Sequence, residues 1–177
     1  MNRTASEFNR DQVLRPYRFN LTYAKDLVAD VSADLLYHSP GPGLENHPGF
    51  TLGHLVTGSA MVADHLGGAY DIPEGWDEMF RRNGPGDPRL PEFSTTNLPS
   101  SEELLTELER QHAIVEALIL KAPAERFERP VEWRFGSIFP TDGDMLTFMC
   151  VTHEAMHLAQ VAAWRRAMGL PSSLGRL

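Results

Sequence analysis

Residues 141–169 read TDGDMLTFMCVTHEAMHLAQVAAWRRAMG, a pattern that indicates a helical fold. Thr141, followed three residues later by Asp144, forms a capping-box pattern that predicts the first turn of a helix. Gly169 predicts where that helix ends, since glycine commonly follows the last helical residue. Apolar residues recur between these points with the period of an α-helix. We therefore expect one continuous helix over residues 142–168.

Three upstream segments show the same period. Residues 11–30 carry an apolar stripe, with Pro16 at a start or a bend of the helix. Pro48 is a favourable first helical residue, and Ser100 with Glu103 forms a second capping box. We therefore expect further helices over residues 11–30, 48–66 and 101–122. Because strand signals are scarce, the four helices predict an all-α four-helix bundle.

The connections between the helices carry predictions of their own. Residues 69–99, between the second and third helices, form a connection too long for a loop that has neither secondary structure nor a function in a compact domain. Within it, Trp76, Met79 and Phe80 predict a short helical turn that packs over the bundle. Residues 131–139 are expected to be extended.

Composition narrows the fold and function classes. The 177 residues are 42% hydrophobic and 23% charged, and with no internal repeat they predict a single domain over residues 1–177. The net charge of −8 argues against a nucleic-acid partner, because phosphate binding needs a basic face. The one cysteine, Cys150, excludes an intrachain disulfide and fits a reducing compartment. Residues 1–20 lack a signal-peptide core and no long apolar run occurs, so we expect no membrane partner and a cytoplasmic location.

His153 and His157 lie four residues apart in the last predicted helix. That spacing separates the two rings by about 40° of rotation and ~6 Å of rise, so both can reach one metal ion. Two core histidines would also explain the pattern, but each would need its own buried polar partner. The letters HEAMH match the H-E-x-x-H motif of zinc peptidases. Residues 158–177 contain no Asp, Glu or His, however, so the third ligand is expected upstream.

His54 is the best upstream candidate for the third ligand. It lies in the first turns of the second predicted helix, and the preceding Gly53 lets a neighbouring helix approach closely. His65 lies about 16 Å further along the same helix axis, too far to share an ion with His54. The remaining histidines are expected on the surface or in a polar core: His38, His47 and His112.

With these motifs in this order, the chain resembles the DinB-like (YfiT-like) superfamily from about residue 11 to residue 171. The resemblance rests on PGFTLGHL at 48–55, WDEMF at 76–80, LPSSEEL at 98–104, HEAMHLAQ at 153–160 and RRAMGLP at 165–171. It implies a metal-binding four-helix bundle, often paired into a homodimer, with a long connection between helices two and three. It also implies that a divalent ion, zinc or nickel, is held by His54, His153 and His157. Many relatives have glycine where this chain has Ala159.

The resemblance also implies a reaction class, because characterised relatives include S-transferases that use a low-molecular-weight thiol. A divalent ion held by three histidines has an open coordination position, where it would activate such a thiol for transfer to a small-molecule substrate. Glu154 is a candidate general base and Gln160 a candidate substrate-binding group. Arg165 and Arg166 could attract an anionic thiol cofactor. Glu154 lies about 80° from the two histidines, which favours a solvated carboxylate or a hydrogen-bond partner of a ligand histidine over a general base. The alternatives are a metal-dependent hydrolase that uses Glu154, and a non-catalytic metal-binding structural or stress module.

Overall fold

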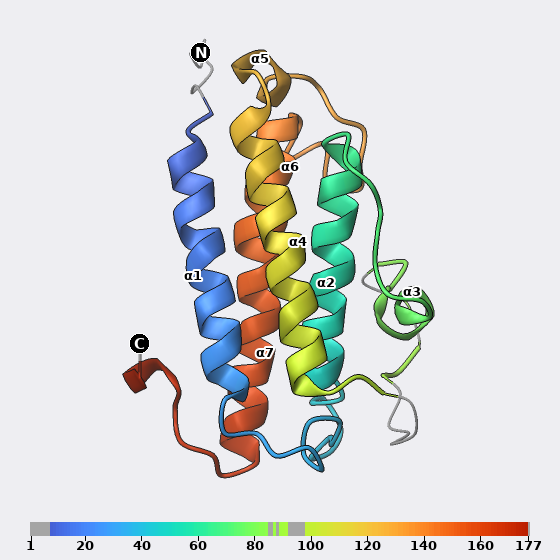
Figure 1. Ribbon diagram of the computed structural model, residues 1–177, viewed down its shortest axis with the longest axis vertical. Coiled ribbons are helices and arrows are strands. Elements are labelled where there is room, and N and C mark those ends of the chain that lie inside the picture. Colours follow the sequence, from blue (N-terminus) through green and yellow to red (C-terminus); the bar gives the residue numbers. More distant parts are fainter. Residues whose placement is uncertain (1–7, 85–86, 88, 92–97, 177) are drawn as a thin grey trace.

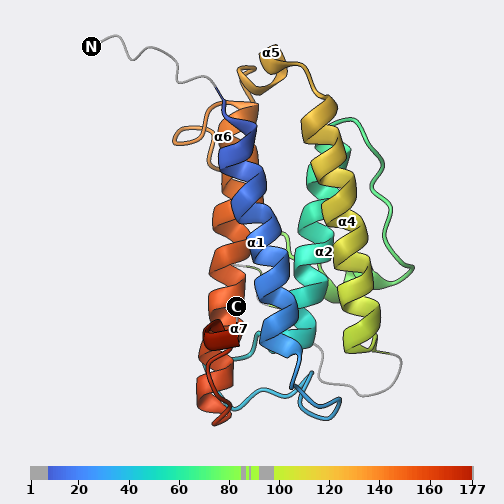
Figure 2. The ribbon, with the colours of Figure 1, turned by 60° about the vertical axis from the view of Figure 1, so that its left-hand side comes forward.

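The computed structural model describes residues 8–84, 87, 89–91 and 98–176. These residues form no β-strand beyond an isolated bridge between Pro130 and Thr141, so the predicted all-α fold is confirmed. Four long columns lie side by side (Figures 1 and 2): α1 (Arg10–Val28), α2 (Pro48–His65), α4 (Ser101–Lys121), and a fourth column of α6 (Asp142–Thr147), η1 (Phe148–His153) and α7 (Glu154–Ala167). The short elements are α3 (Trp76–Phe80), α5 (Ala124–Phe127) and η2 (Leu174–Arg176).

Side chains at the helix starts explain where the columns begin. The Asn9 side chain caps α1. At the start of α2, Nδ1 of His47 accepts a backbone hydrogen bond and Pro48 occupies the first helical position. Ser100 and Thr141 form the two predicted capping boxes, which start α4 and α6. The predicted helix starts are thus confirmed to within about one residue.

The core consists of two apolar clusters with a polar layer between them. α1 and α2 each pack against both α4 and the fourth column. Every column adds apolar side chains to both clusters, and the buried polar side chains at the level between them include Asn20, Ser59, His112 and Glu154. Tyr17 joins this layer, since its hydroxyl lies 3.0 Å from Oγ of Ser59 and its ring stacks on His112 at 3.7 Å. The layer therefore supplies the internal partners that buried polar groups need.

The fourth column is not the single α-helix that the sequence predicts. Between α6 and α7, the six residues of η1 form a π-helix, whose turns contain more residues than α-helical turns. A wheel drawn at 100° per residue therefore loses its phase between Asp142 and His153, and the directions that it gives for α6 relative to the two histidines do not hold. The relative placement of His153 and His157 survives, because both flank the first turn of α7.

The long connection between α2 and α4 contains the predicted short helix. α3 packs against α2 and buries Trp76 and Phe80. Residues 92–97 of this connection lie outside the described residues.

Residues 131–139 form turns and not the extended segment that the sequence predicts. Three aromatic rings of this loop pack with Phe148 of η1 at centroid distances of 5.2 to 5.5 Å: Trp133, Phe135 and Phe139. The apolar residues of the loop therefore reflect an aromatic cluster and not a strand.

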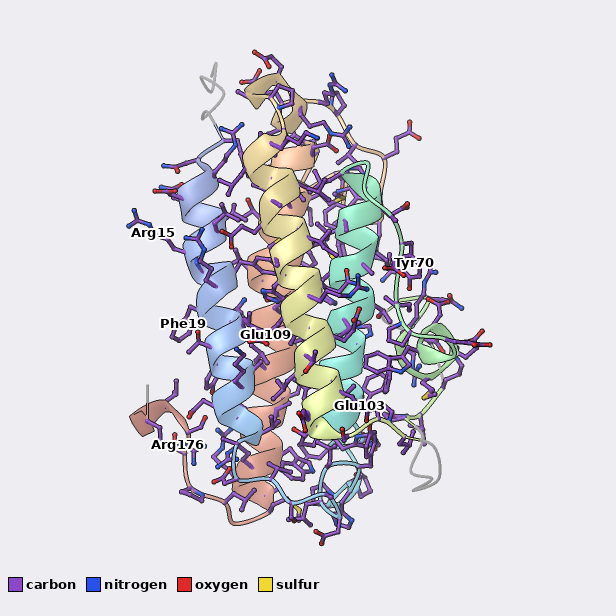
Figure 3. All side chains as sticks on the ribbon, viewed as in Figure 1. Arg15, Phe19, Tyr70, Glu103, Glu109 and Arg176 are labelled. Carbon is purple, nitrogen blue, oxygen red and sulfur yellow. The ribbon has the colours of Figure 1, made fainter. Side chains whose placement is uncertain are left out.

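The outer faces of the columns carry polar and charged side chains. Figure 3 shows Arg15 and Phe19 projecting from the outer side of α1. In the part of the chain that the structure describes, no helix combines the length and the apolar character needed to cross a bilayer.

Candidate metal centre

His54 of α2 and His153 and His157 of the fourth column converge on one point. The ring centroids lie 5.4 Å apart for His54 and His153, 4.6 Å for His54 and His157, and 4.5 Å for His153 and His157. One nitrogen of each ring lies within 4.8 Å of those of the other two. Three histidine nitrogens bound to one ion in a tetrahedral site lie about 3.4 Å apart. The structure thus brings together the three histidines that the sequence analysis singled out, with one nitrogen of each inside a group 4.8 Å across.

His54 is oriented by the backbone of α3. Its Nδ1 lies 2.9 Å from the carbonyl oxygen of Phe80, which accepts the Nδ1 proton and leaves the lone pair of Nε2 free. Phe50 stacks on the ring with a centroid distance of 5.6 Å. Burial lowers the pKa of His54, and the positive charge of Arg82 lowers it further. The imidazole is therefore held neutral with one nitrogen available as a ligand.

His157 is oriented by an amide on its own helix. Its Nδ1 lies 3.2 Å from Oε1 of Gln160, which also accepts a hydrogen bond from the amide of Asn46 at 3.0 Å. Nε2 of His157 again has the free lone pair. Burial, with the nearby His54, lowers the pKa of His157 to about 4. Gln160 thus holds the imidazole N–H, one of the two functions that its place on the ligand face allows.

His153 is placed by close packing. Its Cε1 would lie 3.5 Å from a Cβ added to Gly58, so the ring lies directly against the backbone of α2. On another side, the ring of Phe148 lies at a centroid distance of 6.5 Å. Burial, with the neighbouring His157 and His54, lowers the pKa of His153 to about 3.

The donor set fits a divalent transition metal. All three imidazoles are neutral at pH 7, which is the form that binds metal ions. In two of the three, the N–H of the second ring nitrogen donates a hydrogen bond to an oxygen, as in almost all metal-ligating histidines. Three protein ligands leave a further coordination position for a small molecule.

Glu154 is buried in the polar layer and is not the solvated carboxylate that the helical wheel favours. It is 3% exposed, and its Oε1 lies 2.9 Å from Nε2 of His112. Burial raises the pKa of Glu154, while the contacts with His112, Asn20 and Ser59 act in the opposite direction. The carboxylate is not one of the grouped ligand atoms, and it lines the space behind His153.

The interior side of the site is closed. The space behind His153 has no room for a water molecule, and its lining includes Tyr17, Gly58, Ser59, Cys150 and Glu154. Burial raises the pKa of the Cys150 thiol well above its usual range, so the thiol stays protonated. Gln160, whose side chain contacts His157, is exposed.

The two arginines considered for cofactor binding lie near the end of α7. Arg165 is buried, and its guanidinium donates to Asp30 at 2.9 Å and to the carbonyl oxygens of Leu27 and Pro171. These contacts join α7 to the end of α1 and to the C-terminal segment. Arg166 is exposed in the last turn.

Other histidines have separate structural roles. His65 donates from Nε2 to Asp142 at 2.7 Å, and His47 caps α2. His112 lies in the polar core, one of the two environments expected for it. Two groups that orient the ligands were not predicted, the Phe80 carbonyl and Asn46. The carbonyl has no residue signature, and the Asn46 contact joins segments 114 residues apart.

Comparison with protein families agrees with this architecture. Residues 17–161 match the DinB superfamily, and the matched range includes all three clustered histidines. No curated protein and no solved structure matches the chain. Because the matched range covers most of the 177 residues, the chain belongs to the DinB superfamily.

Proposed function

We propose that His54, His153 and His157 bind a divalent transition metal, zinc or nickel, and that the protein is a metal-dependent S-transferase. Its substrates would be a low-molecular-weight thiol and an electrophilic small molecule. The observation that carries this proposal is the convergence of three neutral imidazoles, two of which are oriented by hydrogen bonds through their second nitrogen. A bound divalent ion would supply Lewis acidity, which lowers the pKa of a coordinating thiol.

The residues of the chain define how reactants would approach. His54 and His153 are backed by α2 and by closely packed interior side chains, so we take the side near His157, where Gln160 is exposed, as the approach for reactants. Gln160 and Asn46 lie on that side and are bonded to each other. They keep the ring of His157 in place, and their remaining amide N–H groups can bind a polar group of the substrate. Gln160 therefore has a proposed positioning function in addition to substrate contact.

The S-transferase hypothesis is favoured over the hydrolase alternative by the position of Glu154. A general base must lie within about 3 Å of the proton that it removes, directly or through one water. Glu154 instead hydrogen-bonds to His112, and both side chains are at most 5% exposed. Thiol transfer needs no such base, because a metal ion itself favours the thiolate. The catalytic function of Glu154 stays a prediction.

Metal binding is tested first. The purified protein should contain about one zinc or nickel ion per chain by elemental analysis, and His54→Ala should abolish tight binding. The matched control is His65→Ala, which removes a histidine from the same helix but outside the cluster. Equal metal content in wild type and His54→Ala would refute the ligand assignment.

Activity is tested with a panel of thiols and electrophiles, including bacillithiol and mycothiol. Turnover should be present in metal-loaded protein and absent after chelation, and it should return when metal is added back. Turnover that is independent of metal would refute the proposed chemistry. Metal binding without any turnover or exchangeable ligand would instead support the structural module. A homodimer and a cytoplasmic location remain predictions, which sedimentation and fractionation would test.

A further inference from the structure

The π-helical segment η1 ends at a proposed metal ligand. It spans Phe148–His153, and α7 follows directly, with His157 one turn later. π-Helical turns are rare in proteins, and those that do occur are frequently found at functional sites. Each acts as a one-residue insertion, which rotates the helix after it by about 100° relative to an uninterrupted α-helix.

Contacts at both ends of the fourth column hold α6 and α7 at fixed rotations about the column axis. In α6, Asp142 is paired with His65 and with Arg126, each at 2.7 Å. In α7, the buried Arg165 is paired with Asp30. η1 absorbs the difference in phase between these two anchored ends. Without it, α6 and the part of the column from His153 onward would be rotated by about 100° relative to each other, so His153 could face His54 only if the contacts of Asp142 were lost.

Asn20 of α1 contacts the backbone of η1 directly. Its side chain is 5% exposed, and Nδ2 lies 3.2 Å from the carbonyl oxygen of Cys150 and 3.3 Å from that of Val151. A π-helical turn shifts the amide donors by one residue, so a carbonyl in the turn loses its usual partner. A buried carbonyl without a donor is costly, and the Asn20 amide provides that donor.

We propose that Asn20 is a positioning residue, which holds η1 in its π-helical form and so directs His153 and His157 toward His54. The effect of Asn20 on metal binding rests on the proposed function, whereas its contact with η1 does not depend on an ion. Removal of the amide leaves the two carbonyls without this donor. The Val151 carbonyl would keep its bond from the backbone N–H of Glu154, whereas an α-helical turn would be needed to give the Cys150 carbonyl a donor, at the expense of the ligand geometry.

The test compares Asn20→Leu, which keeps the branched side-chain skeleton but has no donor, with Tyr17→Phe. The control removes a different buried hydrogen bond from the same layer, that between Tyr17 and Ser59. Co²⁺ affinity is measured by chelator competition, together with the visible absorption of the bound Co²⁺. Backbone chemical shifts of residues 150–154 are measured in the metal-free proteins.

Asn20→Leu should bind Co²⁺ at least tenfold more weakly than wild type, with an altered spectrum, whereas Tyr17→Phe should change affinity less than threefold. Shifts at residues 150–154 should move toward α-helical values in Asn20→Leu only. Unchanged shifts in Asn20→Leu, or equal loss of affinity in both variants, would overturn the proposal. If wild type binds no metal, the proposed function fails, and the shifts still decide whether Asn20 holds η1. If Asn20→Leu does not fold, Asn20→Ala replaces it, and failure of both to fold would overturn the positioning role.

Discussion

Replacement of Gly53 by alanine tests whether α3 packs on α2 as closely as the structure indicates. A Cβ at Gly53 would lie 2.3 to 2.5 Å from three ring carbons of Phe80, whereas ordinary contacts begin at 3.4 Å. The buried Phe80 ring must therefore move by about 1 Å, and overpacking of this kind costs about 1–3 kcal/mol. Alanine also favours a helix by about 0.5–1 kcal/mol relative to glycine, which offsets part of that loss.

Gly58→Ala is the matched control in the same helix. Its added Cβ would meet His153 at 3.5 Å, an ordinary contact, so the variant should gain about 0.5–1 kcal/mol from helix propensity. Because the propensity gain is common to both, the difference between the two variants isolates the overpacking cost of about 1–3 kcal/mol. Urea unfolding of metal-free protein, followed by circular dichroism, measures this difference.

The same substitution should reach the metal site. Displacement of the Phe80 ring also moves its carbonyl oxygen, which accepts the Nδ1 proton of His54. Loss of such a contact typically weakens metal binding by about 10–100-fold, so Gly53→Ala should bind Co²⁺ at least tenfold more weakly than Gly58→Ala. A Gly53→Ala protein as stable as Gly58→Ala would refute the reasoning about α3.

Three other perturbations give separate outcomes. Glu154→Leu leaves Nε2 of His112 without its acceptor, so urea unfolding should show a loss of about 1–3 kcal/mol, with a smaller loss for Glu154→Gln and unchanged metal content in both. Metal-free protein should lose stability below pH 6.5, because the unfolded chain takes up protons at His153 and His157 before the folded chain does, with folded pKa values of about 3 and about 4. The stability held by the two neutral histidines is fully present above pH 6.5, and about 4 kcal/mol of it is lost at pH 5. In urea titrations, a variant with Gln at both positions should lack this pH dependence. Arg165→Ala should destabilise the protein by about 2–4 kcal/mol while Co²⁺ affinity stays unchanged; weaker thiol binding without loss of stability would instead indicate a cofactor function.

Local chemistry made the helix starts predictable. The capping boxes at Ser100 and Thr141 depend only on residues three positions apart, and Pro48 favours a first helical position on its own. These signals act within one turn of the chain. Sequence reasoning therefore located the helices, including the short α3 predicted from Trp76 and Phe80.

The π-helical segment could not be predicted in the same way, because it depends on distant groups. Asn20 and the carbonyl of Cys150 are 130 residues apart in the chain. A helical wheel gives the direction of Glu154 relative to the two histidines, about 80°, but it does not say which side of the column is buried. His153 and His157 point toward α2, whereas Glu154 is buried against His112 of α4. The prediction of an extended segment over residues 131–139 was wrong for a similar reason, since the aromatic rings of this loop pack on Phe148 and not on a neighbouring strand.

The histidine cluster was predictable in part. The spacing of His153 and His157 follows from helix geometry alone, and the lack of ligands after His157 pointed upstream. His54 was then the best remaining choice, and the family resemblance implied the same residue. The Phe80 carbonyl that orients it is a main-chain group, so no residue type signals its function.

The proposed ligands come from two distant segments, and this origin would link metal supply to protein lifetime. His153 and His157 are neighbours on one helix, but His54 joins them only when α2 docks. An ion would therefore bind the native chain far more tightly than the unfolded chain. At a free metal concentration about 100 times the Kd, that preference stabilises the native chain by about 2.7 kcal/mol. Cells short of the metal would then degrade the protein faster, and its abundance would follow the available ion.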